Sequence, residues 1–178
     1  MRPLPISTSR LNLRSAMEGD AKNLFAHYCS NIDSSRYLTR PPHKEIYQTK
    51  QFLTKWCDIA WKVDSPEFAW VVALKNTNEA IGVFLVEREE HRAQIHYGIS
   101  SNFSDQGLIT EAGLAIVSWL LAQKSIQRIW TVCDLENHSS IRVLNKLGFK
   151  NEGILQKWLS LPAFGQTARD CYIYGLTK

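Results

Sequence analysis

Apolar residues in the first hundred positions fall in short runs that predict β-strands. Residues 10–14 alternate between polar and apolar side chains, as in a strand with one buried face. Three further runs, 68–74, 80–86 and 93–100, are rich in β-branched and aromatic residues and are separated by short polar turns. This spacing predicts a β-meander.

Two other segments of this half are spaced for helices. Residues 18–29 are compatible with a helix, and residues 45–61 have the periodicity of an amphipathic helix. The pair Pro41-Pro42 between them interrupts the chain. Two helices are therefore expected before the meander.

The last third of the chain alternates between helices and strands. The pattern predicts helices over 110–123 and 139–147 and strands over 128–133 and 170–176. Thr110 stands where it could cap the first helix, and Gly148 and Phe149 form a typical helix stop. A meander followed by this alternation predicts a mixed α/β sheet with one crossover connection.

Length and composition are those of one globular domain, which we expect to span residues 1–178. The formal net charge of +4 is mild and forms no basic stripe, so no nucleic-acid partner is expected. The longest apolar stretch, near 114–122, is too short to cross a bilayer. The cysteines lie far apart and lack the spacing of a metal site, so buried thiols and a cytoplasmic location are expected.

The loop before the helix at 110–123 is a candidate anion site. It joins a strand to a helix through Gly107, in the segment Ser-Asp-Gln-Gly-Leu-Ile-Thr-Glu-Ala at 104–112. A helix N-terminus offers unpaired N–H groups to a pyrophosphate, and glycine lets the backbone come close to it. An ordinary turn would also contain such a glycine, so the loop alone leaves both interpretations open.

Four segments together resemble a known family. Residues 137–153 match N-x-x-S-x-x-x-L-x-K-L-G-F-x-x-x-G, and residues 8–14 match T-x-R-L-x-L-R. Residues 107–112 match G-x-x-T-E-A, and the pair Arg169-Asp170 precedes the last strand. In these segments the chain resembles the GNAT N-acetyltransferases, and in particular their ribosomal-protein-alanine N-acetyltransferase branch.

The resemblance implies a twisted mixed sheet with splayed central strands and flanking helices, and acetyl-CoA as co-substrate. The pantetheine arm would bind strand backbone near Ile99, and Asn137 would hold the arm from the second helix. The amine would attack the thioester directly, with backbone N–H groups near 97–99 stabilising the oxyanion. Ser140 would protonate the leaving thiolate, or else simply cap its helix. The implied pyrophosphate ligands are the amides of Gln106, Gly107, Leu108, Ile109 and Thr110.

The chain departs from the family pattern in the loop and in the catalytic base. Ser104 and Asp105 stand where the family usually has tryptophan and glycine. We expect the Asp105 carboxylate to face water or to pair with a cation, because it would otherwise repel the phosphates. Gln94 replaces a family glutamate. His96, on the same strand face, is the best substitute base, with Glu136 second and a purely structural histidine as the alternative.

The family's second usual carboxylate, four residues after a G-x-L segment, is also absent, since its place falls near Leu159. Loss of both carboxylates favours an acceptor amine with a low pKa. At pH 7 an α-amine of pKa about 8 is roughly 10% neutral, whereas neutralising a lysine costs about 4.6 kcal/mol. A protein N-terminal α-amine or a small amine is therefore the expected acceptor. The alternative is a coenzyme-A-binding sensor or interaction module without catalysis.

Overall fold

The three apolar runs of the N-terminal half form the expected meander in the computed structural model, which describes residues 1–178. The strands are β3 (Glu67–Leu74), β4 (Ala80–Glu89) and β5 (Arg92–Ile99). All neighbours in the meander are antiparallel. β2 (Leu11–Arg14) continues the sheet beside β3, and the short β1 (Ile6–Ser7) pairs with β2 at the edge.

Three strands from the C-terminal third complete an eight-stranded mixed sheet in the order β1-β2-β3-β4-β5-β6-β8-β7. They are β6 (Arg128–Asp134), β7 (Lys150–Leu159) and β8 (Arg169–Thr177). β6 is parallel to β5, and all other pairs are antiparallel. The predicted mixed α/β fold is confirmed. The pattern did not predict β7, which lies at the sheet edge with nearly all its residues exposed and therefore lacks an apolar alternation.

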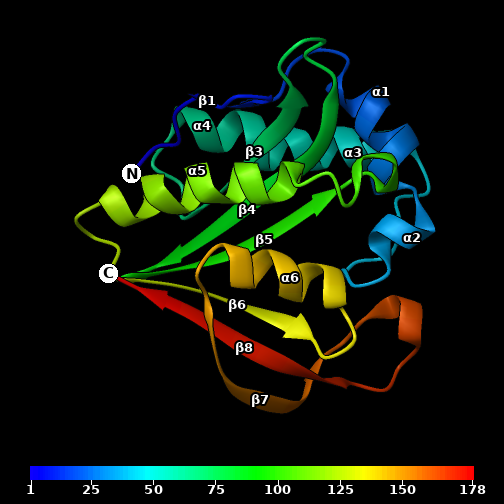
Figure 1. The fold of residues 1–178 in the computed structure, drawn as a ribbon. Coiled ribbons are helices and arrows are strands. Elements are labelled where there is room, and N and C mark those ends of the chain that lie inside the picture. Colours follow the sequence, from blue (N-terminus) through cyan, green and yellow to red (C-terminus); the bar gives the residue numbers. More distant parts are fainter.

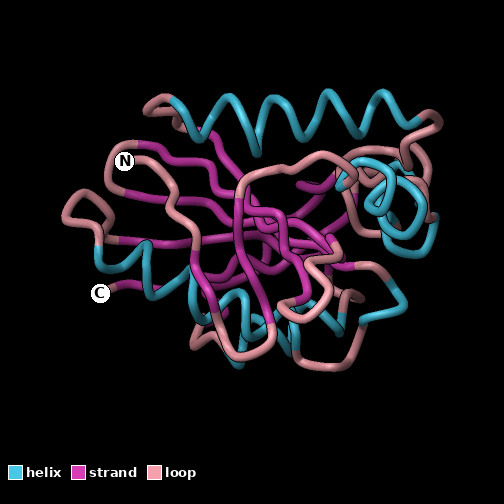
Figure 2. Tube along the Cα trace, turned by 90° about the horizontal axis from the view of Figure 1, so that it is seen from above, coloured by secondary structure: helices cyan, strands magenta, loops and turns pink.

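Helices cover both faces of the sheet (Figures 1 and 2). α5 (Leu108–Ala122) and α6 (His138–Lys146) lie on one face and bury the larger core, which includes Trp70, Ile95 and Ile116. The other face buries Leu24, Leu53 and Val71, among others, under the N-terminal helices. No helix of the chain is long and apolar enough to cross a membrane.

Each of the two N-terminal helices expected from the sequence contains a π-helical turn. The first consists of α1 (Asp20–Leu24) and the turn Phe25–Cys29, and the short α2 (Ile32–Ser35) follows it. The second consists of α3 (Ile46–Leu53), the turn Thr54–Ile59 and α4 (Ala60–Lys62). All four cysteines are buried free thiols, as expected.

Candidate functional site

The central strands β5 and β6 separate soon after they begin, leaving a wedge between them (Figure 1). Their pairing covers only residues 92–94 of β5 and 128–130 of β6, although the strands continue to Ile99 and Asp134. The Thr131 hydroxyl donates a hydrogen bond of 2.7 Å to the Ile95 carbonyl, just beyond the last pair. The splayed central strands implied by the resemblance are therefore present.

The backbone of β5 beyond Ile95 faces this wedge without a partner strand. The Ile95 carbonyl points toward β6, and backbone groups two residues apart in a strand point the same way. Those of Tyr97 and Ile99 therefore point into the wedge, whereas Ser100 turns back and donates to Ile81 of β4. The segment predicted for pantetheine and oxyanion binding thus has free backbone groups, including those of Ile99.

Two hydroxyl groups meet across the wedge. The Tyr97 Oη lies 2.8 Å from the Ser140 Oγ of α6, a candidate acid. Burial raises the pKa of Tyr97 well above its ordinary value, against a smaller lowering by its hydrogen bond to Ser140, so the phenol stays protonated at neutral pH. Sequence reasoning considered only the backbone at Tyr97 and missed its hydroxyl group. Its only signal was its place two residues from the apolar Ile95 and Ile99, on the inward face of β5.

The start of α6 is capped by Asn137 and not by Ser140. The Asn137 side-chain oxygen accepts a 3.2 Å hydrogen bond from the Ser140 N–H, so Ser140 receives the cap and its hydroxyl is left for Tyr97. The Asn137 NH₂ group makes no hydrogen bond within the protein.

The C-terminal end of α6 has the predicted helix stop. Gly148 has φ 86°, and the Phe149 N–H donates to the Leu144 carbonyl, so this prediction is confirmed.

The loop before α5 presents unpaired amides, as an anion site requires. Gly107 is the N-cap of α5 with φ 74°, and no side chain caps the helix. The N–H groups of the next three residues have no intrahelical acceptor because they form the first turn. Those residues are Leu108, Ile109 and Thr110. The expectation that Thr110 caps the helix is wrong, because the left-handed conformation of Gly107 starts α5 three residues earlier.

Asp105 is directed away from these amides. Its side chain is 77% exposed, and its Oδ1 lies 3.1 Å from Arg142 Nη2 of α6, so the predicted outward orientation and cation pairing are confirmed. Its φ of 58° lies in the left-handed region, which glycine adopts most readily and aspartate tolerates. This explains why the family usually has glycine at this place.

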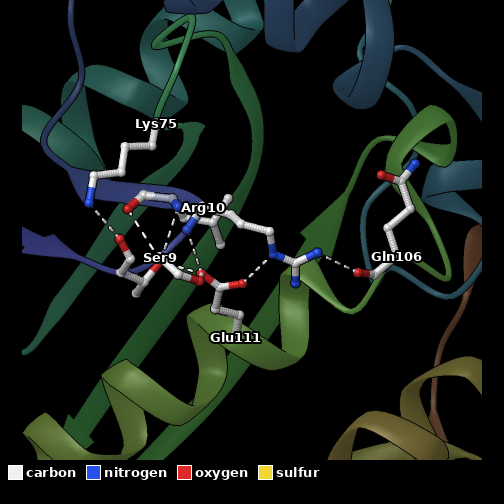
Figure 3. Close-up of polar contacts among 7 residues, drawn as sticks. Ser9, Arg10, Lys75, Gln106 and Glu111 are labelled. Carbon is white, nitrogen blue, oxygen red and sulfur yellow. Dashed lines mark hydrogen bonds and ion pairs between the residues drawn. The ribbon is translucent and has the colours of Figure 1, made fainter.

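A carboxylate of α5 ties the same loop to the start of β2 (Figure 3). Glu111 Oε1 accepts hydrogen bonds from Thr8 Oγ1 at 2.6 Å, Ser9 Oγ at 2.9 Å and the Arg10 N–H at 2.9 Å. Its Oε2 accepts from Arg10 Nε at 2.7 Å. Burial alone would raise the pKa of Glu111, but these donors outweigh it and lower the pKa to about 2. Two of the family segments therefore meet at one ion pair, in which the Glu111 side chain is 17% exposed and the Arg10 side chain is 50% exposed.

The candidate bases do not lie beside Ser140. His96 is on the opposite face of β5, where its side chain is 39% exposed and its Nε2 is 3.8 Å from Glu87 Oε1. Burial lowers the pKa of His96, so the imidazole is neutral at pH 7, the form that a base requires. Glu136 follows β6, and its carboxylate is 3.0 Å from Arg169 Nη2.

The structure thus combines a split parallel strand pair with a glycine-capped helix N-terminus beside it, as the resemblance implies. The chain matches the family model described as an acetyltransferase (GNAT) domain over residues 10–150. It therefore belongs to the GNAT acetyltransferases, and it is an acyltransferase with acetyl-CoA as co-substrate.

Relatives and solved structures agree with this family. An uncharacterized N-acetyltransferase, p20, of Bacillus licheniformis is 28% identical over 174 residues, covering 96% of this chain and 94% of the relative. The microcin C7 self-immunity acetyltransferase MccE, solved with acetyl-CoA and AMP, has a TM-score of 0.83 at 21% identity, with 96% and 94% of the two chains covered. The ribosomal-protein-S5-alanine acetyltransferase of Vibrio fischeri has a TM-score of 0.82 at 19% identity, with 98% and 97% covered.

Proposed function

We propose that the chain transfers the acetyl group of acetyl-CoA to a primary amine by direct attack in a ternary complex. The observation that carries this proposal is the separation of β5 from β6 beside the uncapped start of α5. In this arrangement pantetheine amides pair with the backbone of Tyr97 and Ile99. The pyrophosphate binds the amides of residues 106–110, and the free Asn137 NH₂ group holds the arm between them.

Ser140 acts as the acid in the proposed reaction. The amine nitrogen bonds to the thioester carbon, backbone N–H groups of β5 stabilise the oxyanion, and the carbon–sulfur bond then breaks. The Ser140 hydroxyl gives its proton to the departing thiolate, Tyr97, 2.8 Å away, hydrogen-bonds to the serine oxygen, and water returns a proton to Ser140. His96, neutral and on the opposite face of β5, accepts the proton that the amine loses, with Glu136 as the second candidate.

An α-amine fits this set of groups best. Neither usual family carboxylate is present, so the acceptor must supply its own neutral fraction, which is about 10% for an α-amine at pH 7. One fold neighbour, RimL, is named a ribosomal L7/L12 alpha-N-protein acetyltransferase. We infer a protein N-terminus or a small amine of comparable pKa as the acceptor.

Binding and turnover test the proposal separately. Acetyl-CoA at 100 times its Kd should stabilise the folded chain by about 2.7 kcal/mol, seen as a rise in melting temperature by calorimetry. Free-thiol release should then follow with N-terminal peptides or small amines, and less with lysine side chains. Binding without release from any amine would favour the non-catalytic sensor or interaction module. Absence of any thermal shift would contradict a coenzyme site.

Removing the Ser140 hydroxyl should slow turnover without weakening coenzyme binding. Ser140→Ala is expected to lower kcat by about 10²-fold with little change in KM for acetyl-CoA, because general acids typically contribute 10²–10⁴-fold. Tyr97→Phe should cost less, since the serine proton remains. Ser139→Ala, at the exposed preceding position, is the matched control. A rise in KM alone for Ser140→Ala would assign the hydroxyl to binding.

A further inference from the structure

The Arg10 guanidinium contacts one group in the loop before α5 and another in the first turn of α5 (Figure 3). Its Nε donates to Glu111 Oε2 at 2.7 Å, and its Nη1 donates to the Gln106 carbonyl at 3.0 Å. Glu111 is itself held by Thr8 and Ser9, and Lys75 Nζ donates to the Thr8 carbonyl at 2.8 Å. These contacts fix the position of the Arg10 guanidinium, which donates a hydrogen bond to the loop.

The hydrogen bond to Gln106 sets the direction of the next amide. The chain contains no cis peptide bonds, and in a trans peptide the C=O and N–H groups point in opposite directions. Because the Gln106 carbonyl points to Arg10, the Gly107 N–H points away from it.

The loop needs such a restraint because glycine does not provide one. Rotation of the peptide between Gln106 and Gly107 changes φ of Gly107, and glycine accepts either sign of φ at little cost. The rotated peptide would present a carbonyl oxygen, which repels phosphate, in place of an N–H group. A planar guanidinium with two donors in fixed directions holds one orientation.

We infer that Arg10 is a positioning residue, which holds the Gln106–Gly107 peptide so that the Gly107 N–H faces the coenzyme pyrophosphate. This inference rests on the proposed function, since it assigns the pyrophosphate to this loop. The effect is one of orientation more than charge, because Glu111 neutralises Arg10. Arg10 makes no contact with the reacting atoms.

Arg10→Lys tests the assignment, because lysine keeps the charge but lacks the planar fork. By isothermal titration, coenzyme A should bind at least about tenfold more weakly, while S-acetylpantetheine, which has no pyrophosphate, should bind as it does to the parent. In protein labelled with ¹⁵N-glycine, the Gly107 amide resonance should shift or broaden in the unliganded variant. The matched control is Arg14→Lys at the end of β2, which removes the two parallel hydrogen bonds from Arg14 to the Asp20 carboxylate and does not touch the loop.

Several results would overturn the inference. Unchanged coenzyme A affinity in Arg10→Lys would do so, as would equal losses for coenzyme A and S-acetylpantetheine, or an equal loss in Arg14→Lys. If Arg10→Lys does not fold, Arg10→Gln takes its place with the same expectations. A parent protein that binds neither ligand would instead refute the proposed function, so the two failures are distinguishable.

Discussion

Gly107→Val is expected to weaken acetyl-CoA binding by roughly 10–100-fold, the loss of one or two hydrogen bonds to a charged group. Gly107 has φ 74°, a conformation that a β-branched residue avoids. Valine would relax by rotating the amide away from the pyrophosphate, and its methyl groups would occupy the approach to the loop. The observed φ also predicts a loss of about 1–2 kcal/mol of stability.

Gly19→Val separates these two effects. Gly19 is the N-cap of α1 with φ 94°, and no atom lies within 4 Å of the place where its Cβ would be. The backbone strain is therefore similar, but Gly19 lies beside Arg14, Asn78 and Glu79 and not in the α5 loop. Titration calorimetry and thermal unfolding of both variants give the comparison. Equal coenzyme affinity in the two variants would mean that the α5 loop is only a turn.

Gly98→Ala is expected to destabilise the protein by about 3 kcal/mol, at the upper end of ordinary overpacking. A Cβ at Gly98 would lie 2.0 Å from the Tyr28 hydroxyl oxygen and 2.6 Å from its Cζ. The Tyr28 ring is 3% exposed, so it has no free space to enter. Gly98 lies between Tyr97 and Ile99, the residues of β5 whose backbone faces the wedge. Because the clash would displace this segment, coenzyme affinity should fall together with the stability of the protein.

Urea denaturation with a paired substitution checks the cause. Tyr28→Leu combined with Gly98→Ala should cost less than the sum of the two single changes, because the shorter side chain removes the clash. Gly113→Ala is the matched control, since the nearest atoms to its Cβ are the mobile methyl ends of Leu147 at 2.8 and 2.9 Å. If Gly98→Ala and Gly113→Ala prove equally stable, Tyr28 does not pack on β5 as described.

The elements of the fold were predictable where one face of a strand or helix is buried. The meander and both C-terminal helices carry that signal. β7 does not, because it is exposed at the sheet edge and its pairing with β8 is broken by two register shifts. The separation of β5 and β6 leaves no local mark either, since it depends on pairing between segments over thirty residues apart.

The candidate site divides in the same way. Gly107, Asn137 and Ser140 belong to short motifs and were found from the sequence. The partners of Tyr97 and Glu111 lie 43 and about 100 residues away along the chain, so their roles required the fold. The Thr110 cap failed because a left-handed glycine starts a helix as a polar side chain does, and composition does not distinguish the two.

The short pairing between β5 and β6 also divides the sheet into two parts that share few strand–strand hydrogen bonds. One part consists of β1 to β5, and the other of β6, β8 and β7. Three residue pairs and the hydrogen bond from the Thr131 hydroxyl connect them within the sheet. A ligand that hydrogen-bonds to the unpaired backbone of β5 would extend this pairing. In the proposed complex the coenzyme would therefore add backbone hydrogen bonds between two parts of the sheet that otherwise share a hydrophobic core but few strand pairs.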